Sequence, residues 1–110
     1  MHSDGNLKPY LDQIAGSGVD ALQAIDPLAG MDMRTMKDRV GNRLCLCGNI
    51  DCGLLAAGSY EDVFGATRDL LITCKDGGGL VLGASNAVQA ETPVVNYTAM
   101  IEAWKEFGSY

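Results

Sequence analysis

A histidine and an aspartate two residues apart, near the start of the chain, are its clearest candidates for chemistry. His2 is the only histidine, and Asp4 and Asn6 follow it at alternate positions. An imidazole beside a carboxylate can bind a metal ion or move a proton near neutral pH. An equally weighted interpretation is that these are ordinary polar residues at the end of an incomplete strand. Because the next run reads at once as a helix, we expect the chain to open in the middle of a strand–helix repeat.

Comparable polar residues follow three later apolar runs. Asp26 comes after the first run, Asn49 and Asp51 after the second, and Ser85 and Asn86 after the third. Asn49 and Asp51 could orient a ligand, although a turn that satisfies its own backbone is the alternative. A serine nucleophile needs an adjacent base. Since the sequence offers none, we interpret Ser85 and Asn86 as hydrogen-bonding groups.

Three cysteines lie within or just after the second of these runs. Residues 45, 47 and 49 share one face of a strand, because side chains alternate. Cys45 and Cys47, with Cys52, could form a metal cluster. Cysteine is, however, among the most frequently buried residue types, so we favour packing over metal binding for these thiols.

The hydrophobic pattern predicts three strands, near residues 19–25, 43–50 and 79–84. The last two are apolar at successive positions, which is typical of parallel strands that are buried on both faces. Helices are expected between and after the strands, each opening at a residue that can cap it. The expected N-caps are Asn6, Asp32, Ser59 and Thr92. In the last helix, the spacing predicts a buried face formed by Val94, Tyr97, Ile101 and Trp104.

Alternation of strands and helices predicts an α/β fold with a parallel sheet and right-handed crossovers. Two architectures fit: a segment of a (β/α)8 barrel, or a small open doubly wound sheet. In both, ligands bind beyond the carboxyl ends of the strands. We therefore expect His2, Asp26, Asn49 and Ser85 to lie on one rim of the sheet.

Composition excludes several classes of function. The 110 residues carry a formal net charge of −6, whereas nucleic-acid binding requires clustered Lys and Arg. No apolar stretch approaches the roughly 20 residues of a membrane helix, and no basic run suits an anionic membrane surface. The first residues lack the pattern of a signal peptide. We expect a cytoplasmic protein with reduced thiols.

Taken in order, several segments resemble the C-terminal half of the uroporphyrinogen decarboxylase superfamily. This superfamily includes the decarboxylase of haem biosynthesis and zinc-dependent, corrinoid-linked methyltransferases. The matching segments are residues 2–6, 18–22 and 48–51, the turn at 77–79, and Thr92-Pro93 with Asn96 and Ala99. The resemblance implies that residues 1–110 form one half-barrel domain of about four strand–helix units, the C-terminal half of a (β/α)8 TIM barrel.

The resemblance also implies roles for individual residues. It gives catalytic roles to His2, Asp4 and Asp51. It gives substrate-binding roles to Asn6, Asp26, Asn49, Ser85 and Asn86. The methyltransferases hold zinc through a His-x-Cys pair and a late Cys, but here Asp4 and Ser85 stand at the thiolate positions. Hard oxygen in place of thiolate is poorly suited to thiol-activating zinc, so we expect no metal and no other cofactor.

The implied chemistry is cofactor-free decarboxylation of the acetate arms of a tetrapyrrole, a lyase reaction. The decarboxylase has a histidine after its last strand, and residues 83–86 contain none. We therefore expect the isolated chain to be inactive. A fragment of a corrinoid-linked methyltransferase and a non-catalytic α/β assembly module are the alternatives. An open half-barrel also predicts a partner, either a second copy in a dimer or a complementary N-terminal half-barrel.

Overall fold

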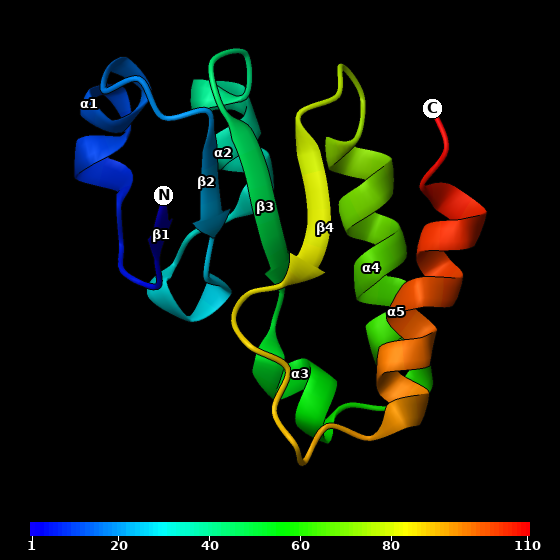
Figure 1. Cartoon of the computed structure of the whole chain (residues 1–110). Helices are drawn as coiled ribbons and strands as arrows, with labels where there is room; N and C mark the ends of the chain where they lie inside the picture. Colours follow the sequence, from blue (N-terminus) through cyan, green and yellow to red (C-terminus); the bar gives the residue numbers. More distant parts are fainter.

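The computed structural model describes residues 1–110, which form a four-stranded parallel sheet with helices packed against one side (Figure 1). The strands pair in the order β1 (His2–Ser3), β2 (Ala21–Ala24), β3 (Cys45–Ile50) and β4 (Leu80–Ala84). The helical segments are η1 (Lys8–Tyr10), α1 (Leu11–Gly16), η2 (Pro27–Ala29), α2 (Met33–Val40), α3 (Cys52–Ala57), α4 (Tyr60–Cys74) and α5 (Val94–Phe107). The prediction of an α/β fold built on a parallel sheet is confirmed.

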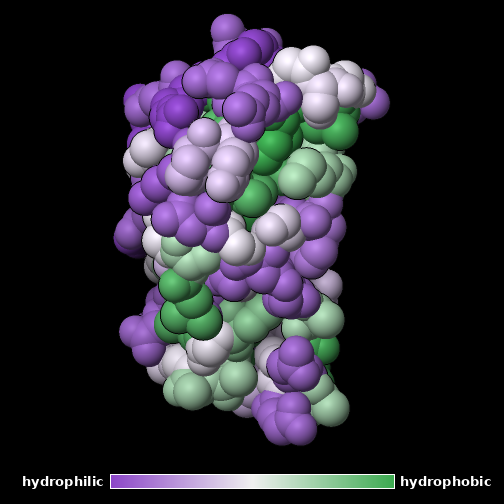
Figure 2. Space-filling model, turned by 90° about the vertical axis from the view of Figure 1, so that its left-hand side faces the viewer, coloured by the Kyte–Doolittle hydropathy of each residue, from purple (hydrophilic) through white to green (hydrophobic).

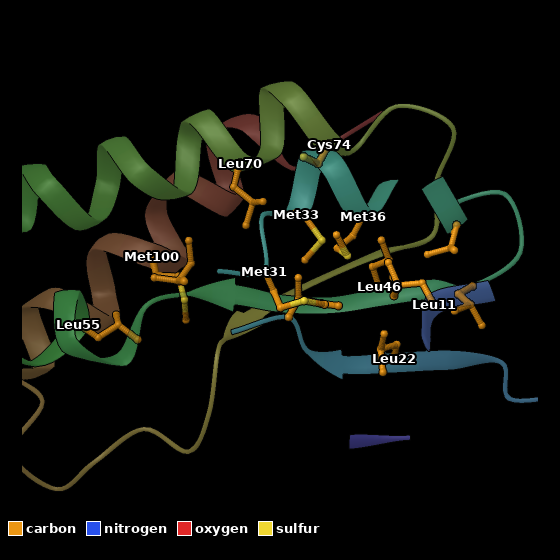
Figure 3. Packing of buried hydrophobic residues seen from close by; sticks show 14 of the residues in the cluster. Leu11, Leu22, Met31, Met33, Met36, Leu46, Leu55, Leu70, Cys74 and Met100 are labelled. Carbon is orange, nitrogen blue, oxygen red and sulfur yellow. The ribbon is translucent and has the colours of Figure 1, made fainter. Parts of the chain in front are cut away.

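The hydrophobic core lies between the sheet and the helices (Figure 3). Leu22 of β2 and Leu46 of β3 are fully buried, and they face Met33 and Met36 of α2. Long unbranched side chains such as Met fill the irregular gaps between a twisted sheet and its covering helices. This single layer of packing holds the strands, and therefore their carboxyl ends, in fixed register.

The opposite side of the sheet is not covered, which corrects the expectation that the strands are buried on both faces. Burial alternates along β2 and β3, so every second side chain is only partly enclosed. We call this side the open face; its residues are Ala21, Gln23, Cys45, Cys47 and Val81. A parallel sheet with helices on one side only is the arrangement found in part of a (β/α)8 barrel.

Two helix starts that depend on local sequence agree with prediction. Asp32 caps α2, with its Oδ2 accepting a hydrogen bond from the Thr35 backbone N–H at 2.8 Å. Ser59 and Asp62 form a reciprocal capping box at the start of α4. The hydrogen bonds that Asp32 and Asp62 accept hold the pKa of each carboxyl below its usual range.

Other helix boundaries differ from prediction. Asn6 does not open an α-helix: its Oδ1 accepts from the Lys8 backbone N–H, and the 3-10 turn η1 leads into α1. The short helix α3, capped by Asp51, was not predicted. Helix α5 starts one residue late, with Pro93 in the capping position that was expected for Thr92. None of the helices has both the length and the apolar character that a membrane-spanning segment requires.

The predicted buried face of α5 is wrong at Val94, Tyr97 and Trp104, whereas Ile101 is partly buried against the core. The buried residues are Asn96, Ala99, Met100 and Ala103, whereas Val94, Tyr97 and Trp104 are exposed. Small side chains at 99 and 103 let α5 pack closely against α4, its main contact. The large apolar side chains therefore lie beside the free edge of β4 and not in the core.

Asn96 connects α5 to the segment that follows α3. Its Nδ2 donates to the carbonyl oxygens of Leu55 and Gly58, at 3.0 and 2.8 Å, and the residue is 2 % exposed. No main-chain group replaces this donor, so both carbonyls depend on it. The helix that Asp51 caps at the rim is thus held in place from α5.

We expect Asn96→Ala to lower the free energy of unfolding by about 2–4 kcal/mol, because it leaves the buried Leu55 carbonyl and the part-buried Gly58 carbonyl without this donor. Chemical denaturation followed by circular dichroism measures this loss. Asn42→Ala, at an exposed turn position, is the matched control and should change stability by less than about 0.5 kcal/mol. Equal effects of the two substitutions would contradict this structural role for Asn96.

Candidate functional site

The carboxyl ends of the four strands meet at one rim of the sheet. Ser3 of β1 pairs with Ala24 of β2, and Ile50 of β3 pairs with Ala84 of β4. The residues that directly follow the strands therefore lie along one edge, at the bottom of the view in Figure 1. Asn49 and Ser85 lie at the same end of the sheet, as the topology predicts.

His2 is the centre of a side-chain cluster at the β1 side of this rim. Its Nδ1 is in short hydrogen-bond contact with Oε1 of Gln23, and its Nε2 lies 3.5 Å from Oδ1 of Asp4. The His2 side chain is 51 % exposed, so a ligand above the open face could reach the ring. An imidazole can accept and return a proton, and here one oxygen atom lies beside each of its ring nitrogens.

Figure 2 views the molecule from this β1 side. Hydrophilic residues, in purple, cover much of this face, and the hydrophobic areas in green are broken into separate patches. The surface on the β1 side is thus largely hydrophilic.

A second cluster joins the loop after β3 to the loop after β4. The Cys52 sulfur accepts hydrogen bonds from the Asn86 backbone N–H at 3.3 Å and from the Ser85 hydroxyl at 3.6 Å. The thiol also lies 3.7 Å from the carbonyl oxygen of Ala87. Sequence reasoning assigned Ser85 and Asn86 to hydrogen bonding but gave Cys52 no part in the contact. Residues 52 and 86 are far apart in the sequence, so no sequence pattern indicated that they would be in contact.

Three other predicted site residues use a side-chain oxygen to cap their own backbone. Asp26 Oδ1 accepts from the Leu28 N–H at 3.0 Å, and Asp51 Oδ1 accepts from the Gly53 N–H at 2.6 Å. Asn6 does the same for Lys8. These contacts fix the rim loops and leave the second carboxylate oxygen of each aspartate available.

Asn49 does not share the face of Cys45 and Cys47, although strict alternation predicted that it would. Its Nδ2 donates to the carbonyl of Met31, at 3.3 Å, in the loop before α2. It also lines a small hollow between α2 and α4, on the helix side of the sheet. Satisfying the Met31 carbonyl accounts for this orientation, so Asn49 connects two rim loops.

The thiols of the open face, Cys45 and Cys47, are free. Burial raises the pKa of the Cys47 thiol, and the neighbouring Cys45 thiol raises it further. Both effects favour the protonated form of Cys47 at neutral pH. No three His, Cys, Asp or Glu side chains are placed to hold one metal ion. The side chains of this chain therefore do not fit the zinc site of the corrinoid-linked methyltransferases, which is built from histidine and thiolates.

An apolar groove of about 660 Å³ runs along the free edge of β4. Nine of its twelve lining residues are hydrophobic, and Val81, Leu82, Tyr97 and Trp104 are among them. Tyr97 and Trp104 are side chains of α5 that the sequence analysis placed in the core. The groove and the open face are continuous at Val81, which is 52 % exposed.

Comparison with known proteins places this geometry in context. The family model described as Uroporphyrinogen decarboxylase (URO-D) matches residues 1–107. Uroporphyrinogen decarboxylases from three strains of Coxiella burnetii are 32 % identical over 102 residues, covering 89 % of this chain and 26 % of theirs. This chain thus spans about a quarter of the length of those relatives.

A solved structure gives the same picture of the fold. A methyltransferase from Methanosarcina mazei superposes with a TM-score of 0.81 and 26 % sequence identity, over 98 % of this chain and 31 % of that protein. The strand order and the one-sided helix layer are therefore shared with part of a larger protein.

Proposed function

The chain belongs to the uroporphyrinogen decarboxylase family, and we propose that it supplies the C-terminal half of a barrel that decarboxylates a tetrapyrrole of the uroporphyrinogen type. One observation carries the proposal: the His2–Asp4 pair sits at the carboxyl rim of a parallel sheet whose second face is open. In barrels of this architecture, the rim is where substrates bind. Residues 1–110 act as one domain in this proposal.

Decarboxylation requires a proton donor. The bond between the carboxyl carbon and its methylene breaks, carbon dioxide leaves, and a proton takes its place on the remaining carbon. His2, held between Gln23 and Asp4, is the group best placed to handle that proton. Asp51 is the second candidate, since only one of its oxygens is used by the α3 cap. The remaining proposed substrate contacts are Asn6, Asp26, Asn49, Ser85 and Asn86.

The rim by itself is poorly suited to a polycarboxylate. Asp4, Asp26 and Asp51 place three carboxylates there, and the chain has a net charge of −6. Holding several substrate carboxylates requires cations at close range. We therefore propose that catalysis needs a completing half-barrel that brings the cationic groups.

Methyl transfer is the second candidate, because a solved structure that shares this fold is a methyltransferase. The side chains at the rim separate the two candidates. Asp4 and Ser85 stand where the resemblance would require thiolates, and no metal-binding group of three is present. One tightly held zinc per chain, found by elemental analysis after dialysis without chelator, would favour methyl transfer over decarboxylation.

The proposal predicts activity only in a completed barrel. We expect purified chain to release no carbon dioxide from uroporphyrinogen above the buffer rate. Mixing it with the part of a Coxiella burnetii decarboxylase that lies outside the matched segment should restore turnover. His2→Ala should then lower the rate by about 10²–10⁴, the usual contribution of a general acid or base.

Each outcome of this experiment has a clear reading. Turnover by the chain alone that is lost in Asp51→Ala would contradict the need for a second half. A stable complex with no turnover would contradict the decarboxylase function and support a non-catalytic assembly module. Gln13→Ala, at an exposed position of α1 that is not among the proposed site residues, controls for general effects of substitution.

A further inference from the structure

We propose that Gln23 is a positioning residue that sets the tautomer of His2. The proposal deepens the function given above, and its use in catalysis rests on that function. The tautomer itself can be measured without any assay of activity. Gln23 was not among the residues that sequence reasoning assigned to the site.

The contact between the two side chains is built by the sheet. His2 and Gln23 are directly paired in the β1–β2 register, and side chains at paired positions project from the same face of a sheet. Two main-chain bonds hold β1 in this register. The Gln23 N–H donates to the Met1 carbonyl at 3.0 Å, and the N-terminal amine donates to the Ala21 carbonyl at 2.9 Å.

The chemistry of the contact fixes where the proton lies. The atom of Gln23 that meets His2 Nδ1 is the carboxamide oxygen Oε1, and a carbonyl oxygen can only accept a hydrogen bond. In the arrangement we propose, Nδ1 therefore carries the hydrogen. In the neutral ring the lone pair is then on Nε2, the opposite of the tautomer that a free imidazole side chain prefers in water.

Asp4 completes the arrangement on the other side of the ring. Its Oδ1 lies 3.5 Å from Nε2, so a proton taken up at Nε2 faces a carboxylate. Gln23 thus directs proton uptake to Nε2, on the side of the ring where Asp4 lies.

Nitrogen NMR tests the proposal directly, because the chain has one histidine and its two ring nitrogens cannot be confused with others. We expect the neutral ring of the wild-type chain to show a protonated-type Nδ1 and an unprotonated-type Nε2. Gln23→Leu removes the acceptor, so the order of the two nitrogen shifts should reverse or the two should converge. Gln23→Glu keeps an acceptor at Nδ1 and should preserve the wild-type order.

Gln13→Leu is the matched control, since Gln13 is an exposed glutamine of α1 and should leave both shifts unchanged. A wild-type ring protonated at Nε2, or shifts that Gln23→Leu does not move, would overturn the proposal. If Gln23→Leu does not fold, the wild-type spectrum and that of Gln23→Glu still decide it. Failure of the decarboxylation assay with the predicted NMR pattern intact would contradict the proposed function alone.

Discussion

Replacing Gly48 by alanine should strongly destabilise the folded chain. A Cβ at this position would lie 2.1 Å from the carbonyl oxygen of Ala24 in the neighbouring strand. The backbone φ of Gly48 is +137°, a conformation that side-chain-bearing residues rarely adopt. The obstacle is main chain in the centre of a paired sheet, so no side-chain movement relieves it.

We expect Gly48→Ala to cost at least about 4 kcal/mol, in the exceptional range for a single substitution. Domains of this size have a total stability of about 5–15 kcal/mol, so the substitution should remove a large part of that stability. Thermal unfolding followed by circular dichroism should show a midpoint lower by about 15 °C or more, or no cooperative transition.

Two other glycines serve as controls for this substitution. A Cβ at Gly65 in α4, or at Gly83 in β4, would meet nothing within 4 Å. Alanine in the middle of a helix is favoured over glycine, so Gly65→Ala should raise stability by about 0.5–1 kcal/mol. Gly83→Ala should stay within about 1 kcal/mol of the wild-type chain. A Gly48→Ala protein as stable as Gly83→Ala would show that β2 and β3 do not approach as described.

Features of the fold that depend on neighbouring residues could be predicted from the sequence. Asp32 and Ser59 are caps because a short polar side chain reaches backbone N–H groups two or three residues ahead. The rim could be predicted for a related reason. Once strands and helices alternate, the parallel arrangement brings the residue after each strand to the same edge.

Features that depend on distant partners could not be predicted in this way. The buried face of α5 is set by its contact with α4, which selects Ala99 and Ala103 over the larger Tyr97 and Trp104. The apolar residues on the other side of α5 satisfy the same helical spacing. Sequence periodicity alone therefore cannot say which of the two stripes is buried.

The candidate site shows the same difference between partners that are close in the sequence and partners that only the fold brings together. The sequence identified His2 and Asp4 because they are close in the chain, but their third partner, Gln23, is joined to them only through strand pairing. Cys52 is likewise brought to Ser85 by the meeting of two loops. Asn49 was assigned to the wrong face because its amide bonds to a carbonyl 18 residues away.

The two free edges of the sheet lead to the final prediction, that the chain associates with a second copy of itself. The sheet order places β1 and β4 at opposite edges, both running in the same direction. A two-fold axis parallel to the strands sets β4 of one copy beside β1 of the other and closes eight parallel strands. This pairing covers both open faces and both grooves.

We expect light scattering at micromolar concentration to give the mass of a dimer. Val81, which is 52 % exposed on the open face beside the groove, is the residue to change. Val81→Asp would bury a carboxylate without a partner in the closed assembly, and should weaken association by about 100-fold, equivalent to about 3 kcal/mol.

Ile72→Asp is the matched control, because Ile72 is also β-branched and 54 % exposed, but lies on α4. Helix α4 covers the other side of the sheet, so this substitution should leave the dimer intact. A compact wild-type monomer would refute the closed pair and would mean that the open face is stable in water. Equal weakening by both substitutions would place the contact on the helices and not on the sheet.

A dimer that only Val81→Asp disrupts would mean that the same face that carries Gln23 and His2 is enclosed by the second copy. Each His2–Asp4 pair would then line a shared interior. Exclusion of water from this interior would strengthen the charge interactions on which proton transfer depends.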